Sequence, residues 1–516
     1  MSAQATFQEG AANRRLRAFE NVAACGLLSS LLVAAGGAAL GFFLWFVLVT
    51  RVARSADHSE VLFLAALLLG LAGAFGGWIL YGHYFARRAG VGVVAAMRWD
   101  AVSWATLVLF PLGLALPVAL GSPSRSAAFA AGAFALVKVL VAARFVYTVR
   151  DVLITFVVTR FSIILVAELA SVVIGQRPGV HVAESSNPLL AVWGRWDAVH
   201  YLDIARRGYT GTDMAFFPLY PLLIRIVGTF VGNELVAGLL VSNAAFFFGL
   251  LFFYKLVEHQ YNRAVAHRAI FYISIFPTAV FFSAVYTESL FFALTVASFY
   301  YIREHRWLTA GFLGALAALT RVEGVLLVVP YAIEVFSPGG ALPWLHSFAS
   351  RGRTARIVAG LLMIPGGLAV YMAWLWILNG DPLYFSHVQS HWDRHLAFPW
   401  VSVMHSFKQI THAHQALTVS NQSIELLFTA LMLTLLVAGF RRLRPSFSAY
   451  MALSILVPMS TSSLMSMPRF ALVLFPMFVI LALWGGRAWA NNAIVAFSLP
   501  LLGLFTVLFA DWYWVA

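Results

Sequence analysis

The sequence predicts an all-α polytopic membrane protein, a bundle of about 13–15 transmembrane helices. Hydrophobic residues make up 61% of the chain and charged residues 11%, whereas a soluble domain carries about 25% charged residues. The apolar residues fall in runs of about 20, the length that crosses a bilayer as a helix. The first run, Asn21 to Thr50, has no charged residue. It is longer than a signal-peptide core of about 7–15 residues, so we expect it to be retained.

The charge and cysteine content exclude other classes. A net charge of +13 in a soluble protein would suggest nucleic acid, but in a membrane protein basic residues mark cytoplasmic loops. We therefore predict no nucleic-acid partner. The only cysteine, Cys25, lies in the first apolar run, which excludes an internal disulfide and a cysteine metal site. Arginine-dominated basic charge with much Ala, Gly and Leu hints at a prokaryotic source.

Five spans are predicted before the first long polar stretch. Arginines flank them on alternate sides, which places the N-terminus in the cytoplasm and the stretch 176–213 on the outer face. The spans are 22–50, 60–85, 101–120, 127–148 and 152–174.

The segment 215–232 decides the later topology. It carries Pro218 and Pro221 near its start and Arg225 inside. If it crossed the membrane, the basic loop that follows would be external, against the charge rule. We therefore expect it to lie along the outer interface or to re-enter. Further spans then begin near residues 235, 267, 288, 307, 324 and 356, and three or four more follow.

This topology puts two long polar loops, 176–232 and 381–423, on the outer face. Because the unusual polar residues of the spans fall at outer helix ends, we expect them to gather with these loops on one side of the membrane.

The first outer loop contains AVWGRWDAVHYLDIARRGY, residues 191–209. On a short helix, Asp197 and His200 would share one face with Tyr201 beside them. The tryptophans around them favour the membrane interface. The alternative is an aromatic anchor in which Asp197 only caps a helix.

Ionisable residues inside apolar runs are costly in a bilayer and are therefore functional candidates. Glu288 lies in AVYTESLFF, Arg321 in ALTRVEGVL, and Arg469 follows Pro468. A purely structural ion pair of Glu288 with Arg321 is the alternative. For three residues of earlier spans we favour structural pairing or snorkelling: Lys138, Arg160 and Glu168.

The second outer loop contains YFSHVQSHWDRHLAFPW, residues 384–400. Its histidines at 387, 391 and 395 have the spacing of metal ligands on a helix, with Asp393 as a further ligand. Polar interface contacts are the favoured interpretation, so we predict no metal.

Nucleotide-binding motifs are absent from the sequence. There is no Walker-type loop, no dinucleotide fingerprint and no soluble α/β region. We therefore predict no cofactor, and we expect any donor to be reached from within the membrane as a lipid-linked substrate.

Taken in order, several segments resemble the PIG-V-like integral membrane mannosyltransferases (GPI mannosyltransferase 2-like), of the GT-C glycosyltransferase superfamily. The resemblance covers roughly residues 151–516, which it implies form the glycosyltransferase core with the outer loops 176–232 and 381–423. It leaves residues 1–150, an N-terminal tail with four additional spans, without a counterpart. The segments are WDAVHYLDIARRGY with AFFPLYPLLIR, FPTAVFFSAVYTESLFF, RWLTAGFLGALAALTRVEG, GDPLYFSHVQSHWDRHLAFPW and MPRFALVLFPMF.

The resemblance implies a GT-C-type bundle whose first exoplasmic loop carries a catalytic acid. Asp197 becomes the expected base, which deprotonates an acceptor hydroxyl in an inverting single displacement. Arg321 and Arg469 become candidates to stabilise the departing lipid phosphate, ahead of Arg195 and Arg206. The remaining residues expected to bind substrate are Trp196, His200, Tyr201, Glu288, Gln389, Trp392 and Arg394.

The implied donor is a polyprenyl- or dolichyl-phosphate sugar, with mannose taken from the family. The acceptor would be a glycolipid, glycan or protein hydroxyl, and a GPI precursor is not expected in a prokaryote. We expect a prokaryotic cell membrane with an exoplasmic active site, or the endoplasmic reticulum membrane if the source is eukaryotic.

Two other classes remain possible readings of the sequence. A transporter or lipid flippase would line a path with buried charges, but it often shows internal repeats, and none is visible here. A structural subunit without chemistry would tolerate the loss of Asp197.

Overall fold

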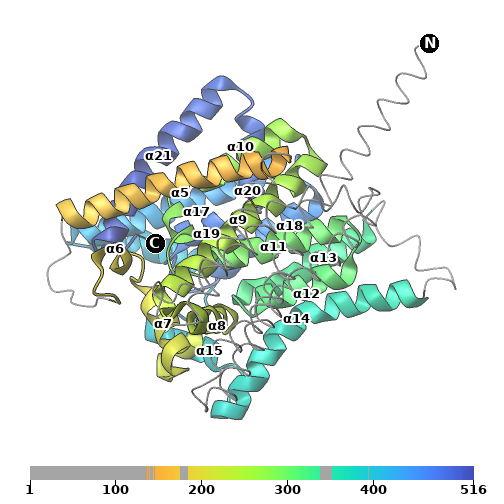
Figure 1. Ribbon diagram of the computed structural model, residues 1–516, viewed down its shortest axis with the longest axis horizontal. Coiled ribbons are helices and arrows are strands. Elements are labelled where there is room, and N and C mark those ends of the chain that lie inside the picture. Colours follow the sequence, from red (N-terminus) through yellow and green to blue (C-terminus); the bar gives the residue numbers. More distant parts are fainter. Residues whose placement is uncertain are drawn as a thin grey trace, which may run out of the picture. The chain divides into compact units, whose positions relative to one another are not determined.

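The computed structural model describes residues 146–174, 184–337, 351–392 and 394–515, together with 136, 139 and 143. Most of the predicted N-terminal region 1–150, including Lys138, therefore lies outside the described residues, as does Asp393. The regular elements of the described residues are helices, as predicted (Figure 1). The α-helices are α5 (Tyr147–Val173), α6 (Pro188–Ala191), α7 (Asp197–Arg207), α8 (Leu219–Val231), α9 (Glu234–Gln260), α10 (Arg263–Ser274), α11 (Glu288–Arg303), α12 (Trp307–Ala318), α13 (Val328–Phe336), α14 (Arg351–Asn379), α15 (Tyr384–His387), α16 (Pro399–His412), α17 (Ala416–Gly439), α18 (Pro445–Met459), α19 (Met467–Val473), α20 (Phe475–Trp484) and α21 (Ala488–Ala510).

Short 3₁₀ helices lie between some of these α-helices. They are η1 (Gly211–Ala215), η2 (Ala279–Phe282), η3 (Val322–Leu327) and η6 (Val388–Trp392). The chain divides into two compact units, one of 1–153 with 229–232 and one of 154–228 with 233–516. The second unit holds nearly all described residues, and the contacts below belong to it.

Five described helices are long and apolar enough to cross a membrane, and the pair α19–α20, bent by 74°, is a sixth if it forms one broken span. The five are α5, α9, α14 (from Gly352), α17 and α21. The other segments predicted as spans near 267, 288, 307 and 324 form helices of 9–16 residues, short of the about 20 that a span requires. Helix α8 has 13 residues, which is consistent with the interfacial or re-entrant placement predicted for 215–232. The protein is a multi-pass membrane protein.

Small residues bring α12 and α14 into close contact. A Cβ on Gly311 would lie 2.1 Å from the carbonyl oxygen of Gly360, and one on Gly367 would lie 2.2 Å from that of Ala315. Such approaches are typical of membrane helices, which associate by close packing and not by a hydrophobic driving force. Glycine is therefore required where the two helices cross.

Buried charges fix other parts of the bundle, as predicted for Arg160. Its guanidinium donates to the carbonyls of Ser274 at 2.7 Å and Ala279 at 2.8 Å. Arg160 thereby provides hydrogen-bond donors for two backbone carbonyls of the irregular segment before α11. At another position, Glu334 accepts from Arg303 at 2.9 Å and from Arg444 at 3.0 Å. The charge rule predicts that the loops next to Arg303 and Arg444 are cytoplasmic, and these two contacts bring them together.

Candidate active site

The loop before α7 turns sharply at Trp196, which has φ 57° and ψ −123°. A non-glycine residue in this region costs on the order of 1–3 kcal/mol and persists only where the surroundings hold it. Asp197 follows as the first residue of α7, and no side chain caps that helix start. The carboxylate points elsewhere, so the capping interpretation of Asp197 is wrong.

Asp197 binds Arg469, a residue 272 positions away in sequence. Oδ2 of Asp197 lies 2.7 Å from Nη1 of Arg469. The same guanidinium donates from Nε and Nη2 to Oε1 of Glu288, at 2.9 and 2.8 Å. Arg469 thus joins the acid of the outer loop to the fully buried acid at the start of α11.

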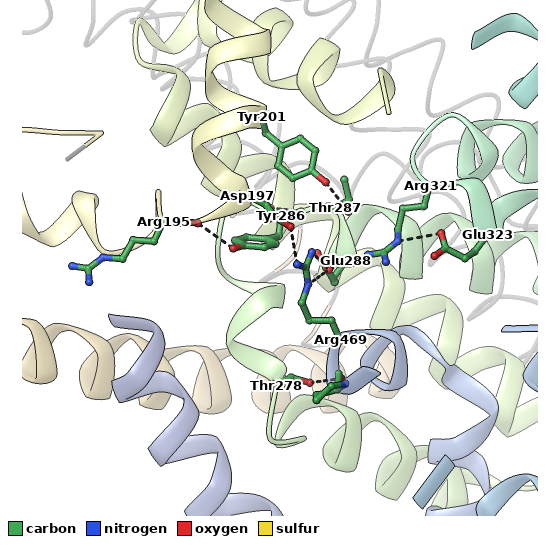
Figure 2. Close-up of polar contacts among 12 residues, drawn as sticks. Arg195, Asp197, Tyr201, Thr278, Tyr286, Thr287, Glu288, Arg321, Glu323 and Arg469 are labelled. Carbon is green, nitrogen blue, oxygen red and sulfur yellow. Dashed lines mark hydrogen bonds and ion pairs between the residues drawn. The ribbon is translucent and has the colours of Figure 1, made fainter. Parts of the chain in front are cut away.

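Arg321 extends the network on its other side. Its Nη1 donates to the same Oε1 of Glu288 at 3.0 Å, and its Nε lies 3.5 Å from Glu323. Burial lowers the pKa of Arg321, but the charges of Glu323 and Glu288 outweigh it and raise the pKa above the usual value. The structural pair considered for Glu288 and Arg321 therefore exists, as part of a larger group. Three carboxylates and two guanidiniums meet here, as Figure 2 shows.

The position of Arg469 is set by two contacts at the start of α19. Glu425, a buried residue of α17, accepts from the backbone N–H groups of Ser466 at 2.9 Å and Met467 at 2.8 Å. Thr278 donates to the carbonyl of Pro468 at 3.0 Å. Because Ser466 has φ 73°, the carboxylate holds a turn that an L-residue adopts reluctantly. Glu425 was not predicted from the sequence, where it is one acid in an apolar run.

Tyr201 borders the network from α7. Its hydroxyl lies 3.4 Å from Oγ1 of Thr287 (Figure 2). Burial, with added repulsion from Asp197 and Glu288, raises the pKa of Tyr201 well above its usual value. Tyr201 therefore stays neutral and can donate a hydrogen bond.

His200 has a partner that the sequence did not indicate. Its Nδ1 lies 2.8 Å from Oδ1 of Asp213, whose Oδ2 accepts from Thr210 at 2.8 Å. The imidazole stacks on Phe216, with ring centroids 4.6 Å apart. A neutral His200 that donates from Nδ1 to this buried carboxylate presents Nε2 as an acceptor. Asp213 lies in the predicted outer loop. The sequence does not link it to His200, because the contact depends on how η1 packs against α7.

The second outer loop reaches the first through Trp392. Its ring lies 6.5 Å from His200 and 6.2 Å from Phe216, edge to face. Gln389 is half-buried, and its backbone carbonyl accepts from the N–H of Arg394 at 3.2 Å. No contact in the described chain brings its side chain to the network.

Arg394 lies near the network without joining it. Its guanidinium donates to the carbonyl of Met465, and its Nε is buried with no hydrogen-bond partner in the described residues. Burial lowers the pKa of Arg394, while Glu425 and Glu323 raise it in part. Arg394 therefore keeps an unused N–H donor near Glu425 and Glu323.

The histidines of this loop make separate contacts. His387 binds Asp381 at 2.7 Å and lowers the pKa of that carboxyl, and His391 lies 3.1 Å from the carbonyl of Val388. No group of three metal-binding side chains occurs within the described ranges.

Arg195 and Arg206, the other two candidates to stabilise the lipid phosphate, do not contact the network in the part of the chain that the structure describes. Arg195 extends away from Asp197 in Figure 2 and is buried beside Trp512. Arg206 pairs with Glu184 at 2.5 Å and lies 3.6 Å from Glu234. Neither is brought to Asp197 by a contact.

With this geometry in place, comparison with known proteins gives a family. Residues 135–336 match the profile of the family Mannosyltransferase (PIG-V). Over this segment the chain is similar to the PIG-V mannosyltransferases. This confirms the resemblance stated from the sequence.

Curated proteins similar to this chain are named GPI mannosyltransferase 2. Proteins from two strains of Cryptococcus neoformans var. neoformans serotype D are 31% identical over 144 residues, 25% of this chain and 34% of theirs. The Schizosaccharomyces pombe protein is 29% identical over 152 residues, 28% of this chain and 32% of its own. The match thus spans about a third of the relatives' length.

Among solved structures, the chain is similar to the apo crystal structure of the Archaeoglobus fulgidus oligosaccharyltransferase. The TM-score is 0.33 at 14% identity, over 68% of this chain and 55% of the other.

Proposed function

We propose that the chain is a membrane mannosyltransferase that uses a polyprenyl- or dolichyl-phosphate-linked sugar. The observation that carries the proposal is the contact of Arg469 with both Asp197 and Glu288. A partly exposed acid, two arginines and a shielded acid meet in a PIG-V-like chain. Buried charges of this kind in a membrane protein mark function.

Asp197 serves as the base. Its carboxylate side chain is 25% exposed, so one oxygen can meet an acceptor hydroxyl while Oδ2 stays on Arg469. As the hydroxyl oxygen bonds to the anomeric carbon, Asp197 takes its proton, and the bond from that carbon to the lipid phosphate breaks. One displacement of this kind inverts the anomeric centre. General-base catalysis contributes roughly 10²–10⁴-fold.

Arginines stabilise the phosphate that leaves with the lipid. Arg321 and Arg469 lie at the site but already neutralise Glu288 and Glu323. Arg394 has no ion pair within 4.0 Å among the described residues and keeps an unused buried N–H. Arg394 therefore adds the charge that an incoming phosphate needs.

The remaining residues line the sugar. His200 offers Nε2 to a hydroxyl, Trp392 offers a ring edge beside it, and Tyr201 can donate a hydrogen bond. The other residues of the proposed substrate site are Trp196, Glu288 and Gln389. They contact the substrate directly or hold the loop that contacts it. The reaction takes place on the exoplasmic face of a prokaryotic cell membrane, with a glycolipid, glycan or protein hydroxyl as acceptor.

The test is sugar transfer by purified protein. Wild type and Asp197→Asn receive radiolabelled polyprenyl-phosphate-mannose and acceptors from the source membrane. Wild type is expected to transfer label, and Asp197→Asn to lose at least about 100-fold. Asp203→Asn, a half-buried acid on the same helix, is the matched control and should keep wild-type activity. Equal transfer by Asp197→Asn would remove Asp197 as the base. Lipid movement without transfer would favour a flippase.

The face of the membrane is tested separately. In a Cys25→Ala background, Ser186→Cys and Arg441→Cys place single thiols on exposed residues of the first outer loop and of a predicted cytoplasmic loop. In intact cells an impermeant maleimide should label the first and spare the second. Labelling at position 441 and not at position 186 would show that the topology is the reverse of the one proposed.

A further inference from the structure

The turn at Trp196 is held by the last described segment of the chain. The Trp196 ring lies 5.6 Å from the ring of Trp512 and 5.2 Å from that of Trp514, the second edge to face at 78°. Trp512 itself has φ 64°. Two strained tryptophans, 316 positions apart, therefore pack on each other directly before Asp197.

A buried charge pair accompanies these rings. Arg195 and Asp511 are each 1% exposed, and the guanidinium carbon of Arg195 lies 5.5 Å from the Trp512 ring. Both oxygens of Asp511 and two nitrogens of Arg195 are buried with no hydrogen-bond partner within the described ranges. Burial lowers the pKa of Arg195 to about 10, opposed first by the charge of Asp511 and then by that of Glu168. Each charge therefore depends on the other for compensation.

The opposite side of the turn is held by the segment that leads to Glu288. Tyr286 donates from its hydroxyl to the carbonyl of Arg195 at 3.1 Å (Figure 2), and Val285 donates from its N–H to the carbonyl of Trp193 at 3.2 Å. Phe509, at the end of α21, packs against the Tyr286 ring at 6.1 Å. The turn is thus clamped by residues 285–286 and by residues 509–514.

We propose that residues 511–515 are a positioning segment for Asp197. The segment touches none of the acids or arginines of the Asp197–Arg469–Glu288–Arg321 network through a described contact. It acts through Trp196 and Arg195, whose backbone fixes where α7 begins and where the Asp197 carboxylate points. A small misplacement of a reacting group costs on the order of 10²-fold in rate. This inference rests on the proposed function for its kinetic part only.

The kinetic test compares variants of one tryptophan in the full-length protein. Trp512→Ala should lower kcat about 10–100-fold with KM for polyprenyl-phosphate-mannose changed by no more than about threefold. Trp512→Phe keeps an aromatic ring and should recover most of the loss. Trp489→Ala removes a tryptophan of α21 that is 69% exposed and should match wild type. An unchanged kcat in Trp512→Ala, or equal losses in the Phe and Ala variants, would overturn the proposal.

Hydrogen exchange tests the clamp without reference to activity. In Trp512→Ala the peptide 193–199 should exchange at least about tenfold faster, while the peptide 467–473 of α19 stays as in wild type. Unchanged protection of 193–199 refutes the clamp. Faster exchange of both peptides would show general loosening and also refute it. If wild type transfers no mannose, the proposed function fails while the exchange result still decides the clamp.

A charge pair variant gives a second route should Trp512→Ala fail to fold. Asp511→Leu removes the main countercharge of Arg195, and Arg195→Met leaves the buried Asp511 without its arginine, whereas the double variant removes both charges. The double variant should exchange more slowly at 193–199 than either single variant. Additive effects of the two substitutions would refute the pairing.

Discussion

Replacing Glu288 by glutamine removes the charge at the centre of the site with little change of shape. Oε1 of Glu288 accepts from Nε and Nη2 of Arg469 and from Nη1 of Arg321, at 2.9, 2.8 and 3.0 Å. The side chain is fully buried. After the substitution Arg469 keeps only Asp197, and Arg321 keeps only Glu323 at 3.5 Å.

The cost follows from burial. Removing one partner of a buried ion pair destabilises a protein by about 3–5 kcal/mol, because a charge is left without compensation. Since each arginine here retains one carboxylate, we expect the lower end, about 3 kcal/mol. With 2–4 °C per kcal/mol in a large domain, Tm should fall by roughly 6–12 °C. Arg469 is then held by Asp197 alone, and its less fixed position should reduce sugar transfer by at least about tenfold.

The measurement is thermal unfolding in detergent, followed by tryptophan fluorescence at one scan rate, because unfolding of a large protein is often irreversible. Glu304→Gln is the matched control, an exposed acid that directly follows the same helix, and it should leave Tm unchanged. If Glu288→Gln melts within about 1 °C of wild type and transfers sugar normally, the buried acid does not organise the arginines and the reasoning fails.

Three further outcomes are expected. Arg469→Lys, which cannot bind Asp197 and Glu288 at once with a planar fork, should lower kcat at least about tenfold, and full activity would show that one point charge suffices. Asp213→Asn should reduce transfer about tenfold or more, because the charge that orients His200 is lost, and the His200→Ala/Asp213→Asn double variant should lose no more than His200→Ala. Gly311→Ala should lower Tm by several degrees, because the new methyl meets a backbone carbonyl, and an unchanged Tm in a differential scan would contradict the close helix crossing.

Much of the site could be predicted from residue types. An acid in a tryptophan-rich outer loop, and charges inside apolar runs, are costly enough in a bilayer to signal function on their own. Asp197, Glu288, Arg321 and Arg469 were found in this way, and the structure joins all four. Arg195 and Arg206 satisfy the same composition rule, yet their side chains have other partners.

The supporting residues could not be predicted. Asp213, Glu425 and Trp512 act through contacts between different elements, 13 positions apart for Asp213 and His200 and more for the other two. Glu425 in particular looks like any acid in an apolar helix until Ser466 is seen to place its N–H group against it.

By itself, the sequence determined that the chain is a membrane protein of helices and which polar residues are too costly to be incidental. Apolar content and the free-energy cost of burying a charge are properties of residue types, so both can be judged from the sequence without knowing the fold. Only the tertiary structure decided which acid meets which arginine, that apolar segments break into short helices at η2 and η3, and that residues 511–515 pack on the turn before Asp197. These outcomes depend on distances of a few ångströms between residues that no sequence period relates.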